Sequence, residues 1–178
     1  MKATGIVRRI DDLGRVVIPK EIRRTMRIRE GDPLEIYTNA DGEVIFKKYS
    51  AIGELGENAT QVADIMHKLA GCPVVVFDRD HVVATSGVTK REFQERRVSP
   101  ELEELMENRR QYFADDPDRK LCPVEGVEQP SLAAMPILSA GDVTGAVAFL
   151  SSSSKQTVSE LQKSLVNAAA QFLGRQVE

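Results

Sequence analysis

The N-terminal part of the chain alternates apolar and polar positions with the period of two that a half-buried β-strand shows. Residues 4–10 alternate in this way, Asp11–Gly14 has the composition of a turn, and residues 15–18 form a β-branched return strand. Pro19 ends that strand and opens a short helix to about Met26, because proline is tolerated where the first helical N–H has no partner. The pattern predicts a hairpin followed by a helix of about two turns.

A second hairpin is predicted after this helix. The segment 31–33 (Gly-Asp-Pro) breaks the helical pattern, residues 34–38 and 43–49 are strand-like, and residues 39–42 form the turn between them. Isolated hairpins are marginal in water, and about 50 residues with one short helix bury too little apolar surface to fold alone. We therefore expect the hairpins of two chains to share one core in an intertwined dimer.

Residues 51–178 begin and end with helical patterns. Near the start, apolar residues recur at spacings of three and four up to an expected helix stop at Gly71: Ile52, Leu55, Ala59, Val62, Met66 and Leu69. Near the end, Thr157–Glu160 resembles a capping box, Gly174 is the expected stop, and the same spacing recurs at Val158, Leu161, Leu165, Ala168 and Phe172. Both seams are too short to require a coiled coil, so they serve the chain's own core, a partner's helices, or both.

Strand patterns lie between these two helices. Residues 73–77 and 81–85 are apolar runs joined across a tight turn, and residues 132–138 and 143–150 form a second pair of the same kind. A further helix is predicted over residues 99–110, because it opens with the serine and proline that suit an N-cap and a first turn. This order of elements predicts an α+β domain with an antiparallel sheet and flanking helices.

Charge is distributed unevenly along the chain. The net charge is −3, yet residues 1–50 hold 11 basic against 8 acidic side chains, whereas residues 51–178 hold 13 against 19. Residues 1–29 alone hold 9 basic against 3 acidic side chains. A basic head on an acidic body is typical of a protein whose head binds a polyanion.

The composition favours a cytoplasmic protein that is not an enzyme. Cys72 and Cys122 set no disulfide framework, and no apolar run approaches the length of a membrane span. The two histidines and two cysteines match no paired zinc-ligand spacing, and the acidic stretch 115–118 lacks the spacing of a calcium loop. We predict no catalytic residue, no metal and no known cofactor; a redox enzyme built on one of the cysteines is the enzymatic alternative.

The N-terminal residues match a known family. Residues 11–19 are Asp-Asp-Leu-Gly-Arg-Val-Val-Ile-Pro and residues 21–24 are Glu-Ile-Arg-Arg. With their flanks they resemble the AbrB-type swapped-hairpin DNA-binding domain over about residues 1–50. The resemblance implies a dimeric β-barrel domain in a nucleoid-associated transcription regulator of endospore-forming bacteria, one that controls late sporulation genes in the forespore. It also implies a DNA-facing set, to which we add the neighbouring Arg9: Arg8, Arg9, Arg15, Arg23 and Arg24.

Arginine suits such a surface for physical reasons. Guanidinium groups make bidentate contacts to phosphates and guanine edges, and they stay charged at any working pH. A two-fold axis would double the cluster into a broad basic surface for double-stranded DNA. Residues 1–29 contain no Phe, Tyr or Trp, which argues against stacking on single-stranded bases. The predicted helix is too short for major-groove recognition, so we expect operators that are read loosely or through DNA shape.

Residues 51–178 resemble a GAF domain in the order of their predicted elements. GAF domains often bind small molecules, so the resemblance implies a regulatory domain with an unidentified small-molecule effector. The long connection from residue 87 to residue 131 would wall the pocket. Phe93, Tyr112 and Phe113 in this connection either line that pocket or fill the core.

Two functional classes remain open at this point. The first is a homo-oligomeric transcription regulator: residues 1–50 bind DNA and dimerise, while residues 51–178 regulate and complete a tetramer through their terminal helices. The second is the antitoxin of a toxin–antitoxin pair that regulates its own synthesis, since swapped-hairpin heads also occur in antitoxins. The antitoxin alternative predicts a disordered acidic tail where the regulator has a folded domain.

Overall fold

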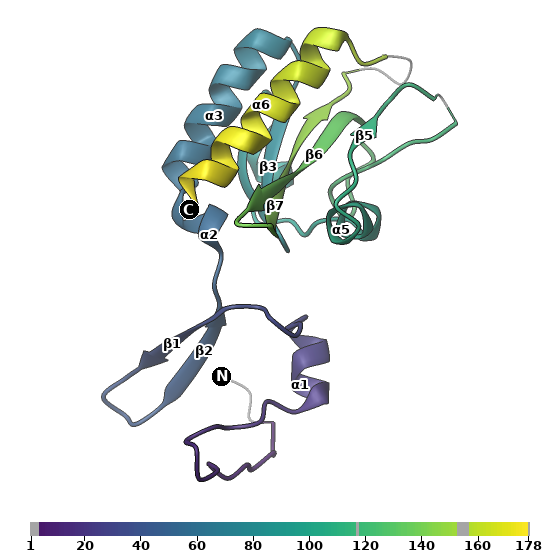
Figure 1. Cartoon of the computed structure of the whole chain (residues 1–178). Coiled ribbons are helices and arrows are strands. Elements are labelled where there is room, and N and C mark those ends of the chain that lie inside the picture. Colours follow the sequence, from purple (N-terminus) through teal and green to yellow (C-terminus); the bar gives the residue numbers. More distant parts are fainter. Residues whose placement is uncertain (1–3, 117, 153–156, 178) are drawn as a thin grey trace. The chain divides into compact units, whose positions relative to one another are not determined.

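The computed structural model describes residues 4–116, 118–152 and 157–177. The chain divides into two compact units, unit 1 (Met1–Tyr49) and unit 2 (Ser50–Glu178) (Figure 1). Among the described residues, no helix is both long enough and apolar enough to cross a lipid bilayer.

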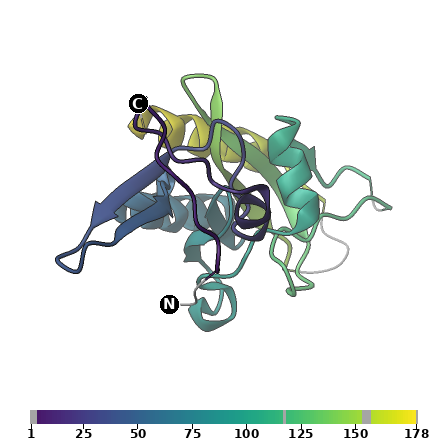
Figure 2. The ribbon, with the colours of Figure 1, turned by 90° about the horizontal axis from the view of Figure 1, so that it is seen from below.

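Unit 1 contains one short helix and one two-stranded ribbon. Helix α1 (Lys20–Thr25) follows Pro19, and strand β1 (Leu34–Thr38) pairs antiparallel with β2 (Val44–Lys48) across the predicted turn. Both views show the β1–β2 ribbon extending away from α1 (Figure 1, Figure 2). The predictions of the helix and of the second hairpin are therefore confirmed.

The first predicted hairpin is present as a turn without strands. The backbone N–H of Asp11 donates to the Arg15 carbonyl at 3.0 Å, and the N–H of Gly14 donates to the Asp11 carbonyl at 3.0 Å. Residues 4–10 and 15–18, however, form no regular strand. The prediction of two strands here is wrong for the single chain. Residues 4–17 are all exposed, so no packed face holds the two arms together, whereas β1 and β2 each have half-buried side chains.

Unit 1 buries very little apolar surface by itself. Within residues 4–49, Pro19 is the one residue that is buried. The large hydrophobic side chains that lie exposed are Ile6, Val7, Ile10, Leu13, Val16, Val17, Met26, Ile36, Tyr37, Val44, Phe46 and Tyr49. Monomeric proteins rarely expose so much contiguous apolar surface, so this unit has the composition of one half of a shared core.

Unit 2 is built on a five-stranded antiparallel sheet with the order β4-β3-β7-β6-β5. Its strands are β3 (Val74–Asp78), β4 (Val82–Ser86), β5 (Tyr112–Phe113), β6 (Ser131–Ser139) and β7 (Asp142–Leu150). Both predicted hairpins are present, as β3–β4 and β6–β7. Ala140 and Gly141 turn the second hairpin with φ angles of 47° and 90°, the left-handed conformation that a tight hairpin turn uses.

Helices cover both faces of this sheet. On one face, α3 (Gly56–Ala70) and α6 (Glu160–Gln176) lie side by side (Figure 1) and join an apolar cluster that includes Ala59, Val62, Val166, Ala169 and Leu173. The short α4 (Lys90–Phe93) and α5 (Pro100–Glu107) contribute to a second cluster, which includes Phe77, Phe93, Leu102, Tyr112 and Leu150. The antiparallel sheet with its flanking helices confirms the predicted α+β class.

Two helix ends follow the sequence signals. Gly71 ends α3 in the left-handed conformation, with φ of 64°. Ser99 caps α5, its Oγ accepting from the Leu102 N–H at 3.1 Å, and Pro100 occupies the first turn. These signals work because they depend on the conformation of only a few consecutive residues.

Three other helix boundaries differ from the prediction. The first helical seam is split into α2 (Ala51–Glu54) and α3, because Gly53 and Gly56 lower the helix propensity around Leu55. The predicted helix over residues 99–110 ends at Glu107. At the C-terminal end, the capping box joins Ser159 to Gln162 instead of Thr157 to Glu160, and Gly174 lies inside α6, which continues to Gln176.

Candidate nucleic-acid interface

The turn between the two arms of residues 4–18 is organised by one carboxylate. Asp11 Oδ1 accepts from the backbone N–H groups of Leu13 at 3.0 Å and of Arg15 at 2.7 Å. The hydrogen bond from the Arg15 backbone N–H contributes most to lowering the pKa of Asp11, and the bond from the Arg15 guanidinium contributes next. A carboxylate that accepts several hydrogen bonds stays ionised at neutral pH, so the turn carries a fixed negative charge.

Arg15 is held by this same carboxylate. Its Nε donates to Asp11 Oδ2 at 2.8 Å, while 69% of the arginine side chain remains exposed. An exposed ion pair of this kind contributes little stability, so a phosphate can compete with Asp11 for the guanidinium. Sequence reasoning missed the pair; an aspartate four residues before an arginine across a tight turn was the available signal.

Arg8 and Arg9 lie in the N-terminal arm, and both are exposed. Successive side chains of an extended segment point to opposite sides. If the arm joins a sheet in the assembled protein, Arg8 and Arg9 face different surfaces. In that arrangement, a ligand on one side of the arm meets only one of the two arginines.

Arg23 and Arg24 lie in the last turn of α1 and are also exposed. Basic residues at a helix C-terminus are favoured by the helix dipole, which helps to keep this end of α1 formed. With six residues, α1 is too short to fill a major groove in the manner of a recognition helix. Its two arginines are better suited to the phosphate backbone.

The described residues offer little for enzyme or metal chemistry. No group of three or more His, Cys, Asp or Glu side chains gathers where a metal ion would bind in the described ranges. Cys72 is buried, and desolvation raises the pKa of its thiol to about 11; burial also raises the pKa of the Cys122 thiol. A thiol that stays protonated at neutral pH is a poor nucleophile, which argues against a cysteine-based redox enzyme.

The three aromatic residues of the long connection are mostly core residues. Phe93 and Tyr112 are 2% and 4% exposed, both within the second apolar cluster. Phe113 packs against the first cluster, and Lys163 Nζ lies 5.4 Å from its ring centroid. Of the three, Tyr112 also lines a cavity.

Comparison with protein families finds two matches. The model described as "Stage V sporulation protein T C-terminal, transcription factor" matches residues 54–178. The model described as "Antidote-toxin recognition MazE, bacterial antitoxin" matches residues 7–53. The two matches meet close to the boundary between unit 1 and unit 2.

Individual proteins match the whole chain or part of it. The chain is 49% identical to Stage V sporulation protein T of Bacillus subtilis (strain 168) over 180 residues, which cover 100% of this chain and 99% of that protein. It is 50% identical to the Transition state regulatory protein AbrB of the same organism over 76 residues, which cover 43% of this chain and 77% of that protein.

A solved structure resembles the second part of the chain. The GAF domain/HD domain protein from Geobacter sulfurreducens matches with a TM-score of 0.56 and 16% identity, covering 74% of this chain and 96% of that chain. At this identity the match concerns the fold alone. It confirms that unit 2 has the GAF fold.

Proposed function

The chain belongs to the Stage V sporulation protein T family of transcription factors, and we propose that it is a homo-oligomeric regulator that binds double-stranded DNA and controls sporulation genes. Residues 1–50 are the DNA-binding and dimerisation domain in this proposal, and residues 51–178 are the regulatory domain. Such a protein acts in the cytoplasm at the nucleoid.

One observation carries the DNA-binding proposal: unit 1 exposes arginines and a large apolar surface together. The apolar surface needs a second chain, and that chain brings a second copy of every arginine. We assign the DNA contacts to Arg8, Arg9, Arg15, Arg23 and Arg24, all of which are exposed. A surface built from guanidinium groups on an arm, a turn and a short helix suits recognition by phosphate contacts and groove shape.

The tetramer is supported by apolar side chains on the outer surface of unit 2. Ile65 and Leu69 of α3 are 52% and 57% exposed, and Leu161 and Phe172 of α6 are 61% and 51% exposed. We call these four residues the outer stripe. Because α3 and α6 lie side by side, a second copy of unit 2 placed on the outer stripe would convert two dimers into a tetramer.

The antitoxin alternative is less well supported. It predicts a disordered acidic tail after residue 50, whereas unit 2 has a five-stranded sheet with two buried apolar clusters. The likeness to Stage V sporulation protein T also extends through that whole region. The match to an antitoxin family model is confined to residues 7–53.

The test is duplex DNA binding by the full chain over a salt series, measured by fluorescence anisotropy. The DNA is one random-sequence duplex and one duplex enriched from a random library by repeated binding. If an arginine contacts a phosphate in each chain of the dimer, its change to alanine removes two contacts. The slope of log K against log salt should then flatten by about 1.8, from ~0.9 per phosphate.

The variants separate two kinds of contact. We expect Arg23→Ala and Arg24→Ala to flatten the slope equally on both duplexes. Replacing an arginine that reads a base would instead cost roughly 1–3 kcal/mol of binding free energy on the enriched duplex and would relax the sequence preference of the protein. Arg91→Ala, an exposed change on α4, is the control and should leave binding unchanged. Unchanged affinity and slope in all five folded arginine variants would refute the proposed surface.

A further inference from the structure

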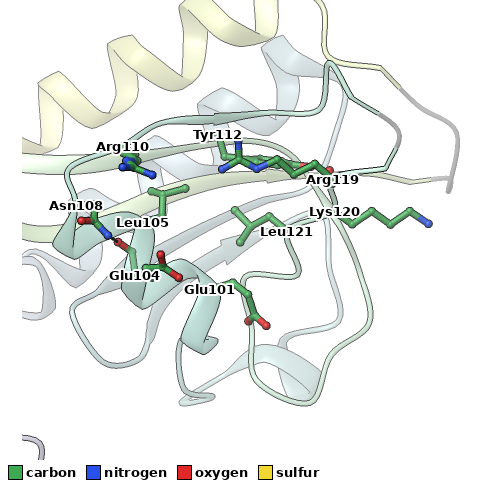
Figure 3. A pocket seen from close by; sticks show the side chains of 9 residues that line it. All are labelled: Glu101, Glu104, Leu105, Asn108, Arg110, Tyr112, Arg119, Lys120 and Leu121. Atoms are coloured by element: carbon green, nitrogen blue, oxygen red, sulfur yellow. Dashed lines mark hydrogen bonds between the residues drawn. The ribbon is translucent and has the colours of Figure 1, made fainter.

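A cavity of about 200 Å³ opens in unit 2 beside α5 and the short edge strand β5. Its walls come from three segments that are separate in sequence: α5 with Asn108, residues 110 and 112, and residues 119–121 (Figure 3). Pockets for drug-sized ligands usually measure about 300–1,000 Å³. This cavity is therefore suited to a ligand smaller than a nucleotide.

The floor of the cavity is apolar and preformed. Leu105, Tyr112 and Leu121 line it and are 8%, 4% and 4% exposed. The Tyr112 hydroxyl donates to the Arg119 carbonyl at 2.8 Å, and the Ser131 N–H donates to the Leu121 carbonyl at 2.7 Å. These two bonds fix the segment 119–121 against the sheet, so the floor does not have to be assembled when a ligand arrives.

The rim of the cavity separates charges of opposite sign. Glu101 and Glu104 extend from α5 on one side, and Arg110 and Arg119 lie on the other, with Leu105 and Leu121 between them (Figure 3). Lys120, next to Arg119, also lines the cavity, and all five charged lining residues are exposed. Within the described residues, the structure shows no ion pair that joins the two sides. A carboxylate side and a guanidinium side at the rim of an apolar floor are complementary to a small molecule that carries an ammonium group and a carboxylate next to each other, with an apolar group that rests on the floor.

We propose that this cavity binds a free aliphatic α-amino acid. The ammonium group lies toward Glu101 and Glu104, the carboxylate lies toward Arg110 and Arg119, and the side chain rests on the floor. Arginine pairs with carboxylates through two parallel N–H bonds, which gives this wall its preference for a planar anion. The inference rests on the proposed function, because it names the effector class of the regulatory domain.

The test is isothermal titration calorimetry of the full chain with L-leucine and two derivatives that each lack one charge. N-acetyl-L-leucine has no ammonium group, and L-leucinamide has no carboxylate. We expect L-leucine to bind and each derivative to bind about tenfold more weakly, the loss expected for one charge-assisted contact at an exposed rim. This comparison uses the unmodified protein and so does not depend on the folding of any variant.

Two variants assign the walls. Arg119→Gln should weaken the binding of L-leucine about tenfold, so that L-leucine no longer binds more tightly than L-leucinamide. Glu101→Gln should abolish the difference in affinity between L-leucine and N-acetyl-L-leucine. Arg91→Gln and Glu92→Gln on α4 are matched exposed controls and should bind L-leucine as the unmodified protein does. The crossed pattern distinguishes an oriented zwitterion from general weakening of the fold.

Three results would overturn the inference. The first is the absence of binding heat up to about 10 mM L-leucine, a range that detects millimolar affinity. The second is equal affinity for L-leucine and both derivatives. The third is that the variants of lining residues bind L-leucine as the controls do. DNA binding is measured on the same preparation. A protein that binds duplex DNA but not L-leucine disproves the cavity proposal alone, whereas one that binds no DNA disproves the proposed function.

Discussion

Glutamate at two positions of the outer stripe should break the proposed tetramer into dimers. The apolar seam predicted near the C-terminal end is divided between the core and the surface, since Val158 and Leu165 join the core cluster. Leu161 and Phe172 lie more than half exposed, whereas Val166 and Leu173 are fully buried against the sheet. The change Leu161→Glu with Phe172→Glu therefore alters the outer surface and leaves the core of unit 2 intact.

The size of the effect on association follows from the exposed fractions of the outer-stripe residues. Burying a large apolar side chain completely stabilises by about 1.5–3 kcal/mol, so the exposed half of each outer-stripe residue has about 0.8–1.5 kcal/mol left to contribute. Four such residues on each of two chains supply about 6–12 kcal/mol, which is close to the estimated association cost of about 4–15 kcal/mol. The double variant removes about half of that gain and adds charge, which weakens association by two or more powers of ten.

Light scattering coupled to size-exclusion chromatography at micromolar concentration measures the outcome. We expect a four-chain mass for the unmodified protein and a two-chain mass, held by unit 1, for the double variant. The matched control is Asn167→Glu with Gln171→Glu, which places the same charges on the polar face of α6. It should keep the four-chain mass. A double variant with the unmodified mass, or an unmodified protein that stops at two chains, would refute the argument.

Three smaller predictions concern single groups. Burial raises the pKa of the Cys72 thiol from 9.0 to about 11, so the folded state keeps this proton at pH values where the unfolded chain loses it. The free energy of unfolding should therefore hold below pH 9.0 and fall as the pH rises toward about 11. Denaturation at several pH values in this range should show a smaller fall for Cys72→Ala. Asp11→Asn keeps an acceptor for the turn but releases Arg15 from its ion pair, so duplex DNA affinity and its salt slope should both increase in the anisotropy assay. Ser159→Ala removes the N-cap acceptor of α6 and should lower the free energy of unfolding by about 1 kcal/mol, whereas Ser164→Ala should change it little.

The sequence predicted best those elements whose signals are local. The β1–β2, β3–β4 and β6–β7 hairpins each combine apolar runs with a turn between them, and pairing follows from adjacency. The strands expected in residues 4–10 and 15–18 have equally good local patterns, but unlike β1 and β2 they have no half-buried residue before Ile18 in the single chain. Strand formation there depends on a partner, which the pattern of one chain does not supply.

The candidate sites divide in the same way. The five arginines could be proposed from the sequence because they lie in or beside the motif of residues 11–24 that resembles a known DNA-binding domain. The cavity beside α5 was not, because its two walls are brought together by the packing of α5 and residues 119–121 on the sheet. Of the aromatic residues named as either lining or core, Phe93 lies in the core and Tyr112 does both, since it is buried and also lines this cavity.

Gly174 has the residue type of a helix stop but does not end the helix, and its position leads to a testable prediction. Helix α6 continues past it to Gln176, and a Cβ at this position would overlap the Leu138 carbonyl oxygen of β6. Glycine is therefore the point of closest approach between helix and sheet. Gly174→Ala gains about 1 kcal/mol of helix propensity, but it must displace backbone, so the net loss should reach about 1–3 kcal/mol. Gly56→Ala on α3 meets no atom within 4 Å and should be neutral or mildly stabilising. Urea denaturation followed by circular dichroism compares the two, and equal stabilities would show that α6 does not need this close contact.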